Sequence, residues 1–161
     1  MTVNYSLSEV FHLAETIEKN GEAFYRRAAE AVDDAKTKEV FLDLAAKEKV
    51  HEQIFATLRE QVCTLADQQI YDPDGQVEAY LRSVAETHVF NLDPDETALA
   101  ASLQSPLSAL KWAIGFEKDT IVYFSALKEA VPEESRAKVE LLIREEYDHI
   151  RQLHQVIKEL N

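Results

Sequence analysis

The fold of this chain is decided by residues 41–62, which read FLDLAAKEKVHEQIFATLREQV. Apolar residues recur here at the spacing of one helix face, at Phe41, Leu44, Phe55, Leu58 and Val62. Glu48 and His51 fill the two positions in the middle of this stripe. A carboxylate in a helix core costs several kcal/mol unless a partner compensates its charge. The stretch therefore predicts a long, buried helix with a functional Glu-x-x-His motif.

A second Glu-x-x-His motif repeats this design near the C-terminus. Glu146 and His149 interrupt an apolar stripe made of Val139, Leu142, Leu153, Val156 and Leu160. Two further amphipathic segments each carry one glutamate in the stripe, Glu18 and Glu117. A Glu from each of two helices and a Glu-x-x-His from each of the other two form the ligand set of a two-metal site in a four-helix bundle. The predicted metal ligands and catalytic residues are Glu18, Glu48, His51, Glu117, Glu146 and His149.

The charge balance of this cluster favours two divalent cations. Four ionised glutamates carry four negative charges, two neutral histidines carry none, and two divalent ions carry four positive charges. The filled site is neutral, whereas the empty site holds four carboxylates that repel one another. Mixed carboxylate and imidazole ligands suit iron or manganese, and zinc or cobalt could substitute.

The two halves of the chain repeat one another. A shift of 99 residues aligns Glu18 with Glu117, and a shift of 98 aligns Glu48 with Glu146 and His51 with His149. The offset changes by one residue inside a turn, where a change in length costs little free energy. The chain therefore reads as two helical hairpins of common design, each of which supplies half of the metal site.

These motifs give the chain a resemblance to the rubrerythrin branch of the ferritin-like superfamily. The residues that carry it are Ile17-Glu18 with Phe24-Tyr25, Glu48-Lys49-Val50-His51, Phe116-Glu117 with Tyr123-Phe124, and Glu146-Tyr147-Asp148-His149. The resemblance covers nearly all of the chain. It implies two iron ions, as Fe²⁺ or Fe³⁺, that react with peroxide or dioxygen.

The resemblance also implies a role for each ligand. Glu18 and Glu117 would be terminal ligands, one for each ion, and Glu48 and Glu146 would bridge the two ions. The histidines His51 and His149 would each bind one ion.

Two departures from the best-known rubrerythrins limit what the resemblance implies. The chain has one cysteine, Cys63, so the four-cysteine iron site of a rubredoxin domain cannot form. The residue three positions after Glu117 is Thr120, where those rubrerythrins place an extra glutamate. The peroxide-linked ligand exchange associated with that carboxylate therefore lacks its residue here.

Capping and turn residues mark the starts of four long helices. These starts follow the capping box of Ser6 and Glu9, the turn Asp33-Asp34, the pair Ser105-Pro106 as cap and first residue, and Pro132, which is expected to act in the same way. The second helix is expected over 35–66 and the fourth over 133–160.

A long connection separates the second and third helices. It contains the turn Asp72-Pro73-Asp74-Gly75 and helical spacing over Gln76–Val89. We expect an all-α fold, a ferritin-like antiparallel four-helix bundle with one long crossover between helices two and three. We expect residues 1–161 to form a single domain of this type.

The net charge, the apolar runs and the cysteine count of the chain indicate which kinds of binding partner and cellular compartment to expect. A net charge of −13 argues against nucleic acid and anionic membranes as partners. We expect no signal peptide, and no apolar run is long enough to span a bilayer. One cysteine favours a reducing compartment over a disulfide framework. We expect a cytoplasmic protein that forms a homodimer or a higher homo-oligomer.

Three functional classes stay open. The first is a non-haem diiron oxidoreductase that reduces hydrogen peroxide, or dioxygen, with electrons from a separate donor protein. The second is a ferroxidase that feeds iron storage, and the third is a non-catalytic bundle that metal ions stabilise. We favour the first because the resemblance is closer to rubrerythrins than to cage-forming ferritins, whose extra C-terminal helix is not expected here.

Residues beside the ligands have alternative interpretations. The helical phase of Glu15, Glu22 and Glu52 places them on other faces, where solvent is expected. Tyr25 lies two turns after Glu18, where it is either a hydrogen-bond donor to a ligand carboxylate or a plain core residue. Asp148 either supports a ligand histidine or faces solvent.

Overall fold

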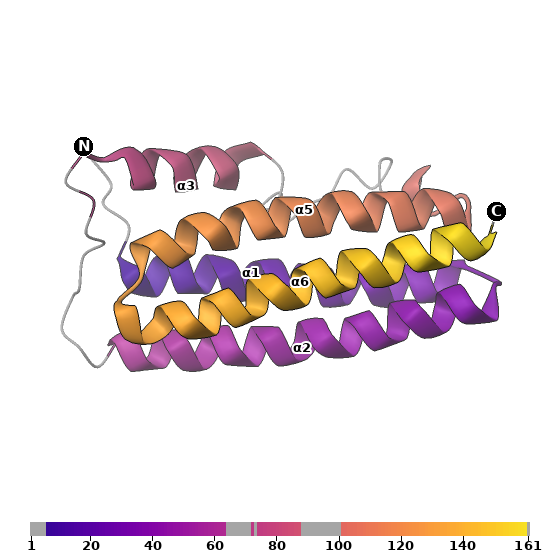
Figure 1. The fold of residues 1–161 in the computed structure, drawn as a ribbon, viewed down its shortest axis with the longest axis horizontal. Helices are drawn as coiled ribbons and strands as arrows, with labels where there is room; N and C mark the ends of the chain where they lie inside the picture. Colours follow the sequence, from indigo (N-terminus) through magenta and orange to yellow (C-terminus); the bar gives the residue numbers. More distant parts are fainter. Residues whose placement is uncertain (1–5, 64–71, 73, 88–100, 161) are drawn as a thin grey trace.

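The computed structural model describes residues 6–63, 72, 74–87 and 101–160. Its helices are, in chain order, α1 (Leu7–Ala31), α2 (Ala35–Cys63), α3 (Gln76–Thr87), α5 (Pro106–Ala130) and α6 (Glu133–Leu160). The four long helices lie side by side as a bundle, and α3 lies outside it against α5 (Figure 1). The predicted all-α, ferritin-like four-helix bundle is therefore confirmed.

The helix directions explain the crossover. The helix α1 packs mainly against α2, and α5 packs mainly against α6, so each pair is an antiparallel hairpin. Both α2 and α5 run in the same direction along the bundle (Figure 1). The connection between them must therefore return along the length of the bundle, and α3 forms part of it. That residues 1–161 form a single domain stays a prediction.

Two of the predicted helix starts show the capping hydrogen bonds that the sequence predicts. The Ser6 side chain accepts a hydrogen bond from the Glu9 amide at 3.2 Å, and the Glu9 carboxylate accepts one from the Ser6 amide at 2.7 Å. This is the predicted capping box. The Ser105 hydroxyl oxygen accepts a hydrogen bond from the Ser108 amide at 3.1 Å, and Pro106 is the first residue of α5. These contacts satisfy amide groups that a helix leaves free at its N-terminus.

The predicted range of the fourth helix agrees with the structure, and the end of the second helix is only partly described. The helix α6 spans Glu133–Leu160, and Pro132 precedes it instead of being its first residue. The Pro132 carbonyl accepts a hydrogen bond from the Ser135 amide at 2.9 Å. Proline has no amide hydrogen, but at this position no hydrogen bond within the helix requires one. The helix α2 is described to Cys63, and the expected last turn to residue 66 lies outside the described residues.

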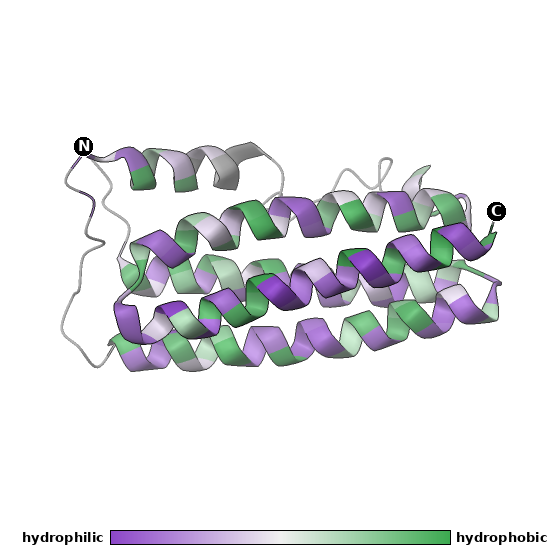
Figure 2. Cartoon of the chain, viewed as in Figure 1, coloured by the Kyte–Doolittle hydropathy of each residue, from purple (hydrophilic) through white to green (hydrophobic). Residues whose placement is uncertain are grey.

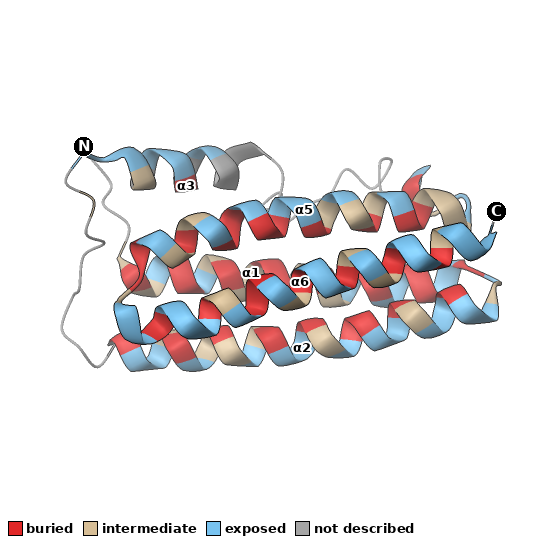
Figure 3. Cartoon of the chain, in the orientation of Figure 1, coloured by how far each residue is buried: buried red, intermediate tan, exposed pale blue. Residues whose placement is uncertain are grey.

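Two apolar clusters fill the bundle on either side of its middle. One cluster includes Phe11 of α1, Phe55 of α2 and Phe124 of α5. The other includes Tyr25 of α1 and Phe41 of α2. The hydrophobic faces of the helices turn inward, as Figure 2 shows, and the buried residues follow the same faces in Figure 3. The middle of the bundle is therefore enclosed by apolar side chains along its axis.

None of the described helices combines the length and the apolar composition that crossing a bilayer requires.

Candidate metal centre

The six predicted ligands meet in the middle of the bundle. Their side chains come from all four long helices, and the exposed fraction of each residue is 1% or less. Helical phase explains this convergence, because each ligand occupies an inward position between apolar residues of its own helix. The residues brought together are Glu18, Glu48, His51, Glu117, Glu146 and His149.

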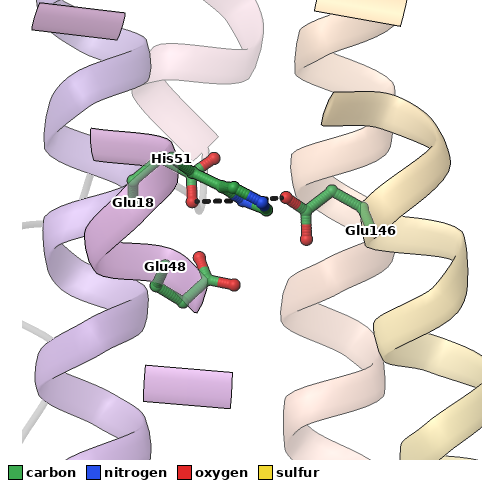
Figure 4. A group of neighbouring side chains, drawn as sticks. All are labelled: Glu18, Glu48, His51 and Glu146. Atoms are coloured by element: carbon green, nitrogen blue, oxygen red, sulfur yellow. Dashed lines mark ion pairs between the residues drawn. The ribbon is translucent and has the colours of Figure 1, made fainter. Parts of the chain in front are cut away.

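The ligand atoms form two overlapping groups, within each of which they lie within 4.8 Å of one another. We call the group of Glu18, Glu48, His51 and Glu146 the first position, and its side chains point toward one another in Figure 4. The group of Glu48, Glu117, Glu146 and His149 is the second position. Glu48 and Glu146 belong to both groups, as bridging carboxylates would.

Many polar atoms in this cluster have no hydrogen-bond partner. Both carboxylate oxygens of Glu18, Glu48 and Glu146 are buried and unsatisfied, and so are Nδ1 of His51 and both ring nitrogens of His149. A buried group of this kind costs about 1–3 kcal/mol, and more when it is charged. Metal ions would satisfy these atoms, because carboxylate oxygens and imidazole nitrogens are their usual ligands.

Ion pairs within the cluster do not compensate its charge. These atoms form ion-pair contacts that lack hydrogen-bond geometry: Nδ1 of His51 lies 2.9 Å from a Glu146 oxygen, and Nδ1 of His149 lies 2.8 Å from the other Glu146 oxygen and 3.1 Å from Glu48. Even with both histidines protonated, four ionised carboxylates would leave two negative charges uncompensated. The buried polar residues of the described part of the chain include no lysine or arginine. The donor set therefore fits two divalent cations better than a salt-bridge network.

The comparison with known protein families agrees with this donor set. The sequence model of the rubrerythrin family matches residues 2–97, which is more than half of the chain. The chain belongs to the rubrerythrin family. The match includes Glu18, Glu48 and His51, and the internal repeat and the bundle bring Glu117 and the second motif to the same place.

A solved structure extends the likeness over both halves of this rubrerythrin-family chain. It is a Thermotoga maritima protein described as a candidate ferritin-like diiron-carboxylate protein. The two share 27% sequence identity over 98% of each chain, with a TM-score of 0.74. No curated protein sequence matches this chain significantly. The family and the buried cluster together support iron binding.

Burial and crowding shift the ionisation of this rubrerythrin-type centre when it holds no metal. Burial, followed by repulsion from neighbouring carboxylates, raises the pKa of Glu18 well above its usual value and that of Glu117 to about 8. For the histidines, burial disfavours the charged ring, but the surrounding carboxylates outweigh it. Their pKa values rise to about 9 for His51 and about 12 for His149. The metal-free centre therefore holds protons at neutral pH.

Metal binding should release these protons and should strengthen as the pH rises. Only a neutral imidazole binds a metal ion. Neutral pH is below the raised pKa values of His51 and His149, so both rings are protonated before metal binds. Calorimetric titration with Zn²⁺ in buffers of different ionisation enthalpy would count the protons released. An affinity that does not change with pH, with no proton release, would contradict this account.

Two side chains outside the ligand set contact ligands directly. The Tyr25 hydroxyl, buried between α1 and α5, donates a hydrogen bond to Oε1 of Glu117. This resolves the two alternatives for Tyr25 in favour of the donor. A Glu145 oxygen lies 2.7 Å from Nε2 of His51. Because a carboxylate only accepts, Nε2 carries the proton and Nδ1 faces the cluster.

Of the two alternatives for Asp148, the structure agrees with the one in which it faces solvent, and Glu145 contacts a ligand histidine instead. The Asp148 side chain is 55% exposed and pairs with Arg151. Helical spacing does not single out Glu145, which lies beside Glu146 on α6 and reaches across to α2. Its only sequence signal is its place four residues before His149, and this spacing is common in an acidic helix.

The glutamates beside the ligands lie outside the cluster, as expected. Glu15 contacts Arg59 at 3.2 Å, Glu22 contacts Arg26 at 2.8 Å and Glu52 contacts Lys49 at 2.6 Å. Their side chains are only 15–19% exposed, so the expectation that solvent surrounds them is wrong in degree. Each is held against a basic side chain that spans part of the helix surface.

Gly21 leaves space for one of the shared carboxylates. A Cβ atom at this position would lie 2.7 Å from Oε2 of Glu48 and 3.1 Å from the Phe116 ring. Such a distance is shorter than van der Waals contact, so a side chain here would displace the Glu48 carboxylate. Gly115, in the middle of α5, has open space around its Cβ position.

Replacing Gly21 by alanine should weaken metal binding while leaving the metal-free helix intact. Alanine favours a helix interior by about 0.5–1 kcal/mol over glycine, which offsets part of the cost of moving Glu48. Metal affinity and the melting temperature of metal-free protein would be measured for Gly21→Ala and for the control Gly115→Ala. Unchanged metal affinity in Gly21→Ala would show that the Glu48 carboxylate is not held where the structure places it.

Proposed function

We propose that this protein is a non-haem diiron oxidoreductase that reduces hydrogen peroxide, or dioxygen, with electrons from a separate donor protein. The observation that carries the proposal is the pair of overlapping ligand groups that share Glu48 and Glu146 in a buried, apolar setting. Glu18 and His51 would complete the first position, and Glu117 and His149 the second. Manganese or zinc could occupy the same ligands.

Bound iron would supply the electrons that reduce the oxidant, one from each ion. The protein's own contribution is to hold ligands and exclude water. Apolar clusters close the bundle on both sides of the centre, which strengthens electrostatic interactions inside it. Burial and the Glu117 charge raise the pKa of Tyr25 well above its usual value, so its hydroxyl stays protonated and holds Glu117 in place.

The proposal predicts that the ferrous protein oxidises rapidly on mixing with peroxide. The protein would be loaded with Fe²⁺ without oxygen and mixed in a stopped-flow instrument with peroxide or with dioxygen. Reaction with both oxidants and little preference between them is expected, because Thr120 is not a carboxylate. The buried Thr120 hydroxyl donates to the Phe116 carbonyl in its own helix at 3.1 Å.

Thr120→Glu should shift the preference toward peroxide if a carboxylate at this position sets it. Val122→Glu is the control. Val122 is 45% exposed on the same helix, so a glutamate there adds the same charge outside the centre. Oxidation of many ferrous ions per chain would favour a ferroxidase, and bound iron that neither oxidant changes would favour a structural metal site. Zinc-loaded protein provides the redox-inactive reference.

The partners and setting of this activity are part of the proposal. A separate electron-donor protein, assembly as a homodimer or higher homo-oligomer, and a cytoplasmic location stay predictions. Copurification of a reducing protein and measurement of the mass in solution would test the first two.

A further inference from the structure

The internal repeat allows each residue around one metal position to be compared with its counterpart around the other. The ligands themselves are the same in both halves, but two supporting residues differ. The counterpart of Glu145 on α6 is Lys47 on α2, at the shift that aligns Glu146 with Glu48. The counterpart of Tyr25 on α1 is Phe124 on α5. The two halves of the repeat therefore differ in the residues that contact the ligands.

The first position has a negative charge behind its imidazole. Oε2 of Glu145 accepts a hydrogen bond from Nε2 of His51 at 2.7 Å. The Glu145 side chain is 44% exposed and comes from the opposite hairpin, so it also fixes the orientation of the ring across the bundle. A carboxylate in this arrangement makes the imidazole a stronger donor and selects the nitrogen that faces the metal.

The second position lacks this support. Lys47 points to Asp43 at 2.8 Å and to Gln152 at 3.1 Å, and an ammonium group cannot accept a hydrogen bond from a histidine. Nε2 of His149 is buried and has no hydrogen-bond partner among the described residues. Its ring is therefore the weaker and less firmly oriented ligand of the two.

Tyr25 also makes the second position a weaker site than the first. The Tyr25 hydroxyl donates to Oε1 of Glu117 and withdraws part of the negative charge that this carboxylate would offer to a cation. Phe124 has no hydroxyl, and both oxygens of Glu18 are free of hydrogen bonds. Glu18 can therefore direct its full charge to a cation at the first position.

We propose that the two metal positions are inequivalent, and that the first position, with Glu145 as its positioning residue, binds metal more tightly and fills first. The inference rests on the proposed metal centre and adds an order of binding to it. The second position would be the one that loses metal first when metal is scarce.

Stepwise titration with Co²⁺ tests this order without reference to catalysis. Metal-free protein would be titrated in the absence of oxygen, and visible absorption with calorimetry would give two binding constants. Glu145→Gln should weaken the tighter constant by about 10–100-fold and leave the weaker one in place. The melting temperature of the metal-free variant should not change, because Glu145 is partly exposed.

Glu140→Gln is the matched control for the loss of one negative charge on α6. Glu140 pairs with Lys128 at 3.0 Å and Arg144 at 3.2 Å and does not contact the cluster, so both constants should stay at their original values. Glu18→Ala should remove the tighter step, and Glu117→Ala should remove the weaker one.

Each outcome has a distinct meaning. Two equal constants in the original protein, or a Glu145→Gln variant that keeps both constants, would overturn the inequivalence while leaving the metal centre in place. Loss of the weaker step in Glu18→Ala would reverse the assigned order and also overturn it. Failure of the original protein to bind Co²⁺ at all would instead refute the metal centre on which the inference rests.

Discussion

Alanine at Glu48 or at Glu146 should abolish the binding of two metal ions. Each residue belongs to both ligand groups, so one substitution removes an oxygen ligand from both positions at once. Loss of a terminal ligand such as Glu18 would affect only the first position. Elemental analysis after anaerobic loading with Fe²⁺ would measure the metal content per chain. Glu48→Gln and Glu146→Gln, which preserve side-chain size, would separate loss of the ligand from loss of packing.

The controls for this prediction are neighbouring glutamates that differ only in helical phase. Glu15→Ala removes a contact with Arg59, and Glu52→Ala removes one with Lys49. Neither side chain reaches the cluster, so both variants should retain the full metal content. Equal metal loss in the two sets would show that the inward and outward faces of α1 and α2 are assigned incorrectly.

Saturation with metal should raise the free energy of unfolding substantially. A ligand that binds only the folded state contributes about 2.7 kcal/mol at a concentration one hundred times its dissociation constant, and about 4.1 kcal/mol at one thousand times. The effect should be pronounced here because the metal-free centre buries four carboxylates, of which Glu18 and Glu117 have raised pKa values. Two bound cations would replace this repulsion with direct ligation.

Thermal unfolding would be followed with Zn²⁺ or Fe²⁺ and with a chelator. A melting temperature that stays constant while metal analysis shows both positions filled would contradict the prediction. Glu146→Ala serves as the internal control, because a variant that cannot bind two ions should lose most of the metal-dependent increase.

Much of the fold and of the ligand set follows from local sequence. The positions of Glu48 and His51 relative to Phe41 and Phe55 depend only on the period of an α-helix, and this period is the same in every helix. The same reasoning predicted the capping box at Ser6, which involves residues three positions apart. Local geometry therefore determined which residues face the core.

The sequence was less informative at helix ends. The range predicted for α6, 133–160, agrees with the structure, but Pro132 lies immediately before the helix instead of inside it, because proline is accepted at both positions. Asp148, which lies inside the second motif, is expected either to support a ligand histidine or to face solvent, and its exposed side chain, paired with Arg151, agrees with the second alternative.

The sequence by itself determined the family pattern, the two hairpins and the six inward-facing residues, because each depends on spacing within a single helix. The tertiary structure alone decided that Glu145 of α6 contacts His51 of α2, that Tyr25 of α1 contacts Glu117 of α5, and that Gly21 makes room for Glu48. These contacts join different helices. They depend on how far each helix is rotated and shifted against its neighbour, and packing of the whole bundle sets both quantities.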